Sequence, residues 1–309
     1  MRLTLEFANA DDAAFALAAS PGFARDGICF AACGSGLYRS GDGGASWRKL
    51  RTSSELVTTA VAVSPAFAQD RSVFAAVKGG ILRSSDDGET WFTAAFPAPP
   101  PVFSSLLVSP DFERDGFLLA ASMEDGVFSS SDRGARWQPW NFGLFDLNVL
   151  CIALSPAWIE DETVYAGTET GLYCSTNGGR AWRHTGFPAE CAPALCIVCI
   201  EEGDARETRL IVGTEQHGLM ASCDNGETWE RLAAAPISGA VNQLHAGRRG
   251  ENGLTIHALV EDGIMRSDDA GKTWTNALDM DGTPTAMLPL AEGILLGIGG
   301  RGLAFLPNR

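Results

Sequence analysis

The sequence lacks the features of a secreted, membrane-inserted or nucleic-acid-binding protein. Its first residues, MRLTLEFANADD, contain no basic segment followed by an apolar one. No apolar run approaches the roughly 18 residues that span a bilayer. Basic residues are scarce, since 23 lysines and arginines against 38 acidic residues give a formal net charge of −15. A chain of that charge repels phosphate backbones. We therefore expect a cytoplasmic protein that neither inserts into membranes nor binds nucleic acid.

Residues that could hold a metal or a redox centre are few or poorly spaced. There are only four histidines, and no spacing selects a third ligand to join His217 and His245. The chain has eight cysteines, and the densest cluster of them contains a C-x2-C pair, Cys196 and Cys199. This pair falls in an apolar strand, where its side chains would project to opposite faces. We therefore expect no metal, no cofactor, and reduced thiols that pack as small hydrophobic residues.

What the sequence does contain is one octapeptide, Ser-x-Asp-x-Gly-x-x-Trp, in six copies. The copies are Ser40–Trp47, Ser84–Trp91, Ser130–Trp137, Ser175–Trp182, Ser222–Trp229 and Ser267–Trp274. Successive tryptophans lie 44 to 47 residues apart, and short apolar strands separated by turns precede each copy. Four short antiparallel strands in each period of about 45 residues are typical of a β-propeller blade.

The residue types of the octapeptide suit a tight turn. The third side chain can accept hydrogen bonds from its own turn, the glycine suits a positive φ, and the tryptophan supplies apolar area between blades. The third-position residues are Asp42, Asp86, Asp132, Asn177, Asp224 and Asp269. The tryptophans are Trp47, Trp91, Trp137, Trp182, Trp229 and Trp274.

These octapeptides resemble the BNR/Asp-box repeat, and the resemblance covers nearly the whole chain. That family includes sialidases, xyloglucan-cleaving glycosidases, sortilin-type receptors and photosystem II assembly-factor-like propellers. The resemblance implies that the octapeptides are structural and lie on the face opposite any functional site.

The count of strands predicts seven blades. After Trp274 the chain has three more apolar segments, Thr285–Leu290, Ile294–Ile298 and Leu303–Leu306, without an octapeptide. A spare strand, Arg2–Phe7, lies at the other end. Pairing them removes two exposed sheet edges. We therefore predict an all-β fold, a single seven-bladed β-propeller over residues 1–309, with blade seven formed by 284–307 plus 1–7.

Candidate ligand-binding residues come from the loops on the face without octapeptides. Glu169 and Glu215 occupy equivalent turns of neighbouring blades, and a solvated acidic loop is the alternative interpretation. An extended inter-blade loop contains large aromatic side chains, which can bind a partner or merely cap the blades. The candidates are Trp140, Asn141, Phe142, Glu169, Glu215, His217 and His245.

Two functions remain open. The resemblance implies that a sialidase would need a tyrosine nucleophile. The chain has only three tyrosines, Tyr38, Tyr165 and Tyr173, and all three occupy repeat positions, so a sialidase is disfavoured. The xyloglucan enzymes place their cleft between two propellers, whereas this chain has one. We therefore expect a non-catalytic interaction or assembly scaffold with a protein partner and no catalytic residue. The alternative is a glycoside hydrolase or carbohydrate-binding propeller that uses carboxylates such as Glu169, Glu215 or Asp146.

Overall fold

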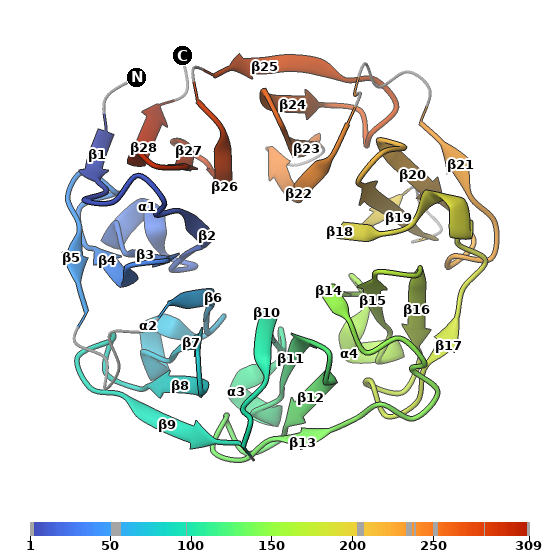
Figure 1. Cartoon of the computed structure of the whole chain (residues 1–309), viewed down its shortest axis with the longest axis horizontal. Helices are drawn as coiled ribbons and strands as arrows, with labels where there is room; N and C mark the ends of the chain where they lie inside the picture. Colours follow the sequence, from blue (N-terminus) through green and yellow to red (C-terminus); the bar gives the residue numbers. More distant parts are fainter. Residues whose placement is uncertain are drawn as a thin grey trace. The chain divides into compact units, whose positions relative to one another are not determined.

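The computed structural model describes residues 3–50, 57–96, 98–202, 207–232, 237, 239–249, 253–280 and 282–307. These residues form seven four-stranded sheets. The fold is an all-β, seven-bladed β-propeller, as the sequence predicts (Figure 1). Contacts within the chain define two compact units, Met1–Pro139 with Thr285–Arg309, and Trp140–Pro284.

The first unit contains blades one to three. Blade one consists of β2 (Ala14–Ala19), β3 (Cys29–Cys33), β4 (Gly36–Ser40) and β5 (Arg48–Lys49). Blade two consists of β6 (Thr58–Val63), β7 (Val73–Val77), β8 (Gly80–Ser84) and β9 (Phe92–Ala95). Blade three consists of β10 (Val102–Val108), β11 (Leu118–Met123), β12 (Gly126–Ser130) and β13 (Gln138–Pro139). Within each blade, neighbouring strands pair antiparallel in chain order.

The second unit contains blades four to six. Blade four consists of β14 (Val149–Leu154), β15 (Val164–Thr168), β16 (Leu172–Ser175) and β17 (Arg183–His184). Blade five consists of β18 (Ala194–Glu202), β19 (Glu207–Thr214), β20 (Leu219–Ser222) and β21 (Glu230–Arg231), preceded by the short helix η1 (Ala189–Cys191). Blade six consists of β22 (Val241–Arg249), β23 (Gly253–Val260), β24 (Gly263–Ser267) and β25 (Thr275–Asp279).

Blade seven joins the two ends of the chain. Its strands are β26 (Pro284–Leu290), β27 (Gly293–Ile298), β28 (Gly302–Pro307) and β1 (Leu3–Glu6), in the spatial order β1-β28-β27-β26. β1 pairs antiparallel with β28, and Leu3 lies opposite Ala304. The predicted closure is confirmed, although Arg2 lies outside the described residues and the pairing centres on residues 302–304 rather than on 303–306.

A one-turn helix follows the first strand of blades one to four. These helices are α1 (Phe23–Asp26), α2 (Phe67–Asp70), α3 (Phe112–Asp115) and α4 (Trp158–Asp161). In blade one, Ser20 Oγ donates to Asp26 Oδ2 at 2.7 Å, and Asp26 Oδ1 accepts from the backbone N–H of Ile28 at 2.9 Å. Each of these helices begins at the aromatic residue of a Ser-Pro-x-aromatic sequence, such as Ser20–Phe23. This sequence closes a turn and buries its aromatic side chain. Among the described residues, no helix has the length and apolar character to cross a bilayer.

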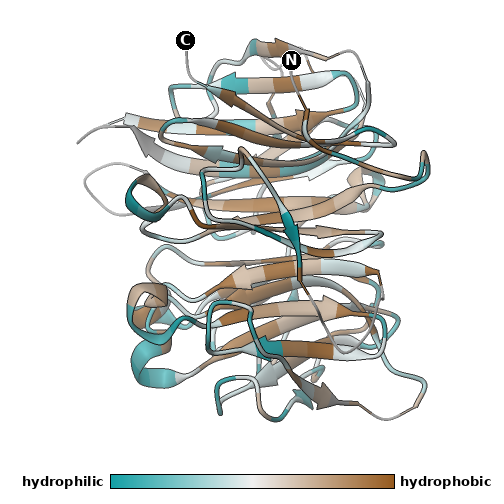
Figure 2. Cartoon of the chain, turned by 90° about the vertical axis from the view of Figure 1, so that its left-hand side faces the viewer, coloured by the Kyte–Doolittle hydropathy of each residue, from teal (hydrophilic) through white to brown (hydrophobic). Residues whose placement is uncertain are grey.

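Neighbouring blades of a unit share their cores. Figure 2 shows hydrophobic residues along the strands and hydrophilic residues concentrated in the turns. In the first unit, Phe30 of blade one meets Phe67 of blade two edge to face at 6.3 Å between centroids. Phe103 is buried and packs edge to face on Phe96 at 5.0 Å between ring centroids, because the inter-blade segment folds inward onto blade three.

All eight cysteines are free thiols. Cys196 packs in a cluster of blades five and six, whereas Cys199 contacts a cluster of blades four and five, so the C-x2-C side chains do point to opposite faces. Burial raises the pKa of Cys29 and Cys151 to about 12. Burial likewise raises the pKa of Cys33, Cys174, Cys191, Cys196 and Cys199. Only Cys223 is exposed.

This distribution predicts the reactivity of the thiols. A thiolate, not a thiol, attacks disulfide reagents, and seven thiols are held protonated by burial. We expect Ellman's reagent to modify about one thiol rapidly in the native protein and all eight after denaturation. Cys223→Ser should remove the fast phase. Fast modification of three or more thiols in the native protein would contradict this packing.

Candidate functional site

The six octapeptides form one repeated turn. In blade five, Ser222 Oγ donates to Asp224 Oδ1 at 2.7 Å, and Gly226 N–H donates back to Ser222 Oγ at 2.9 Å. Thr228 donates its N–H to Asp224 Oδ1 at 2.9 Å and its hydroxyl to Oδ2 at 2.5 Å. These hydrogen bonds lower the pKa of Asp224 to about 2. Asn177 Oδ1 accepts the corresponding bonds from the Ser175 hydroxyl and the Ala181 N–H, so an amide oxygen can also hold this turn.

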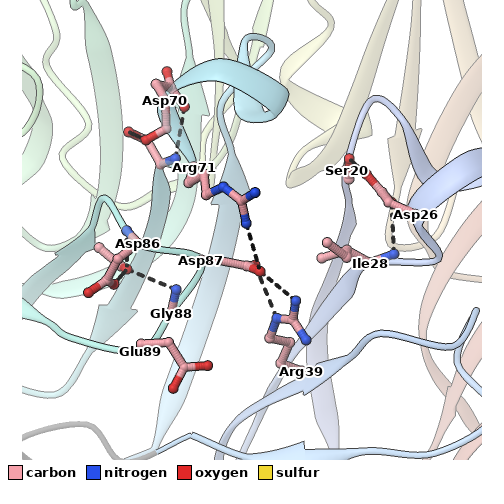
Figure 3. Close-up of polar contacts among 12 residues, drawn as sticks. Ser20, Asp26, Ile28, Arg39, Asp70, Arg71, Asp86, Asp87, Gly88 and Glu89 are labelled. Atoms are coloured by element: carbon pink, nitrogen blue, oxygen red, sulfur yellow. Dashed lines mark hydrogen bonds and ion pairs between the residues drawn. The ribbon is translucent and has the colours of Figure 1, made fainter.

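A carboxylate beside the second octapeptide aspartate links blades one and two. Asp87 has a positive φ of 66°. Its carboxylate accepts from Arg39 Nε at 3.0 Å and from Arg39 Nη2 at 2.5 Å, and Arg71 Nη1 lies 3.7 Å away (Figure 3). A two-pronged arginine–carboxylate pair fixes geometry as well as charge. The charges at this octapeptide are therefore used within the fold.

The octapeptide tryptophans differ in burial. Trp182 and Trp274 are buried, whereas the other four are only partly buried. The indole N–H usually donates to the carbonyl of the octapeptide glycine, as Trp229 does to Gly226 at 2.9 Å. In blade four it donates instead to the Trp140 carbonyl at 2.8 Å.

That exception fixes the position of the candidate residues Trp140, Asn141 and Phe142. The backbone N–H of Trp182 donates to the Phe142 carbonyl at 2.8 Å, and the Arg180 guanidinium lies 5.3 Å from the centre of the Trp140 ring. Arg180 and Trp182 belong to the octapeptide of blade four. The prediction that these three residues lie on the face without octapeptides is therefore wrong, because the chain that follows the short strand β13 first runs along the octapeptide of blade four.

The same loop then reaches the opposite end of blade four. Asp146 Oδ2 accepts from the Thr170 N–H at 2.9 Å and the Thr170 hydroxyl at 2.6 Å, and its Oδ1 accepts from the Asn148 N–H at 3.0 Å. The Asn148 side-chain amide donates to Glu169 Oε2 at 3.1 Å. These four residues, which we call the Asp146 network, tie the inter-blade loop to the turn between β15 and β16.

The electrostatics of the Asp146 network favour an ionised Asp146. Partial burial acts to raise its pKa, but the hydrogen bonds from Thr170 and Asn148 outweigh burial and lower it. Glu169 is exposed and is oriented by the Asn148 amide. Sequence reasoning missed Asn148 and Thr170. The only available signal was their position in loops of the predicted functional face, since Asn148 lies two residues after Asp146 and Thr170 directly follows Glu169.

Glu215 and the two histidines have different environments. Glu215 is exposed in the turn after β19, the counterpart in blade five of the turn that carries Glu169. His217 lies two residues further, half-buried, with its Nδ1 buried and without a hydrogen-bond partner. His245 lies in the middle of β22, opposite His257. Its prediction as a loop residue on the functional face is wrong, because β22 extends through that position.

The described residues contain no group of three or more histidine, cysteine or acidic side chains that could hold a metal ion. Among the described residues, every carboxyl group whose pKa departs clearly from its ordinary value has a lowered pKa, mainly through hydrogen bonds that outweigh burial. At the candidate site this group is Asp146, so the edge presents an ionised carboxylate held by hydrogen bonds.

No family model matches the sequence. An oligoxyloglucan-reducing end-specific xyloglucanase of Emericella nidulans is 27% identical over 202 residues, which are 59% of this chain and 24% of that enzyme. Two further similar proteins are also named as xyloglucanases, one of them as probable. The chain spans less than a third of the length of the curated relatives it matches.

Solved structures show the same fold. A GH74 xyloglucanase of Xanthomonas campestris superposes with a TM-score of 0.72 at 19% identity, over 98% of this chain and 52% of that one. YCF48 bound to a D1 peptide superposes with a TM-score of 0.68 at 15% identity, over 98% of this chain and 96% of that one. The expectation of a non-catalytic scaffold is overturned by the relatives, whose names point to glycoside hydrolysis.

Proposed function

We propose that this protein is a propeller of the glycoside hydrolase type that binds a xyloglucan-like glucan at the end of blades four and five opposite the octapeptides. The class of ligand comes from the relatives named as xyloglucanases. The observation that carries the site is the Asp146 network, which holds Glu169 on the Asn148 amide at 3.1 Å. Polar groups with fixed directions are what a polyhydroxylated ligand requires.

We further propose that the six octapeptides are Asp-boxes of the BNR type. Their repeated Ser–Asp–Gly hydrogen bonds support this assignment. It gives them a structural role and leaves the chemistry to the other end of the blades.

Glu169 and Glu215 are the proposed hydrolytic pair. Glycoside hydrolysis uses two carboxyl groups on either side of the scissile bond, one as acid and one as base or nucleophile. These two residues occupy equivalent turns of neighbouring blades, and the first strands of those blades, β14 and β18, are in contact. Asp146 is a positioning residue, because both of its oxygens are bonded within its own network.

The test is an assay for hydrolysis of xyloglucan oligosaccharides, in which the release of reducing ends is measured. Glu169→Gln and Glu215→Gln keep the shape of each side chain and remove its proton chemistry. Each should lower kcat/KM by at least about 100-fold, the usual size of a general acid–base contribution. The matched control is Glu160→Gln, an exposed glutamate of α4 in blade four at the octapeptide end, which should leave kcat/KM unchanged.

Two outcomes would contradict the proposal. If the parent protein neither cleaves nor binds xyloglucan oligosaccharides, the function is wrong. If it cleaves them and both glutamine variants match the parent, the catalytic pair lies elsewhere.

A further inference from the structure

Two phenylalanines of the loop 140–148 expose nearly their whole side chains. Phe142 is 80% exposed and Phe145 is 90% exposed. Single exposed hydrophobic residues are ordinary on protein surfaces. Phe145 differs from such residues because the chain is anchored on both sides of it and because the next residue, Asp146, is held by polar groups.

The segment before Phe145 is anchored to blade four. Leu144 is buried, and its N–H donates to the Asn141 carbonyl at 3.0 Å. Gly143 has a φ of 80°, and a Cβ there would lie 2.1 Å from the Trp182 carbonyl oxygen. Only glycine therefore allows the loop to pack this closely on the backbone of Trp182.

The segment after Phe145 is anchored by the Asp146 network. Asp146 is bound by Thr170 and by the Asn148 N–H, so the residue next to Phe145 is tied to the turn that carries Glu169. Leu147, on the other side of Asp146, is 36% exposed. The loop therefore displays apolar side chains immediately beside a set of carboxylate, amide and hydroxyl groups.

Such a pairing of apolar and polar groups matches the two sides of a pyranose ring. The ring presents C–H groups on its faces and hydroxyl groups around its edge. An exposed aromatic ring can cover the C–H face, while nearby carboxylates and amides bind the hydroxyls. Because the Phe145 backbone is already ordered, little conformational freedom of the loop would be lost on binding.

We infer that Phe145 is a sugar-stacking residue, and that it holds one pyranose unit of the glucan beside Glu169. This inference rests on the proposed function. It adds a residue that contributes to the affinity for the glucan and takes no part in bond cleavage. Phe142, at the other end of the same loop and beside the octapeptide of blade four, has no such role.

The experiment compares Phe145→Ala, Phe145→Trp and Phe142→Ala by calorimetric titration with xyloglucan oligosaccharides. Phe145→Ala should raise Kd by about three- to tenfold, in line with the strength of aromatic contacts, and should raise KM with little change in kcat. Phe145→Trp should bind at least as tightly as the parent. Phe142→Ala, which changes another highly exposed phenylalanine of the same loop, should bind like the parent.

The outcomes separate this inference from the proposed function. Binding by the parent together with an unchanged Kd for Phe145→Ala would overturn the inference and leave the proposed function standing. Equal weakening by Phe142→Ala and Phe145→Ala would also overturn it, since a general loss of apolar surface would then explain both. A parent protein that binds no xyloglucan oligosaccharide would overturn both. Because both side chains are exposed, the melting temperatures of the variants should match that of the parent.

Discussion

Replacement of Trp274 by alanine is expected to destabilise the protein by about 3–5 kcal/mol, the usual cost of truncating a buried aromatic side chain. Trp274 is 6% exposed and packs in the cluster shared by blades five and six. Its indole N–H donates to the Gly271 carbonyl at 3.0 Å. A Cβ at Gly271 would lie 2.7 Å from Ile211 Cδ1, so the turn itself presses on blade five. Removal of the Trp274 ring therefore leaves a cavity that the tightly packed blades five and six cannot easily close.

The measurement is urea denaturation followed by far-ultraviolet circular dichroism, which does not depend on tryptophan fluorescence. Trp91→Ala is the matched control, because Trp91 is the same octapeptide position in blade two but is only partly buried. Its loss of stability should be clearly smaller. Equal losses for the two variants would show that burial of the ring does not determine its contribution.

Deletion of residues 1–7 is expected to give the second large effect. It removes β1, which covers the edge of β28. It also removes the Thr4 hydroxyl that accepts from the Trp47 indole N–H at 3.1 Å. Leu5 and Phe7, which pack against the core of blades seven and one, are lost as well. An uncovered strand edge pairs readily with other chains, so we expect a lower melting temperature and aggregation.

Differential scanning fluorimetry and light scattering measure the two effects. A shorter deletion, of residues 1–2, leaves β1 complete and serves as the control. If the protein without residues 1–7 melted within a degree of the parent and stayed monodisperse, β1 would not be needed to close blade seven.

The fold could be predicted from the sequence because its determinants are local and repeated. The serine, aspartate and glycine of each octapeptide bond within one turn, as Ser222, Asp224 and Gly226 do, so their spacing reveals the blades. The closure could be predicted because an unpaired sheet edge is costly. The predicted spare strand Arg2–Phe7 therefore had to pair with the last strand of the chain, as β1 does with β28.

The candidate site was predicted less well because it depends on where a loop goes in space. Trp140 and Glu169 both lie in loops, and the sequence gives no sign that the first follows the octapeptide of blade four. Burial of Phe103 similarly depends on the path of the segment before β10. The Asn148–Glu169 bond joins residues 21 positions apart, and no local spacing rule reveals such a contact.

The asparagine of the fourth octapeptide makes the response to acid uneven along the chain. The aspartates of the other five turns have lowered pKa values, about 2 for Asp224 and Asp269. Their stabilising bonds are complete above the ordinary pKa of an aspartate and are lost as the pH falls toward 2. Asn177 takes up no proton in this range, so acidification weakens five turns and spares the one in blade four. The blade that carries Glu169 is thus the one whose octapeptide turn keeps its bonds in acid.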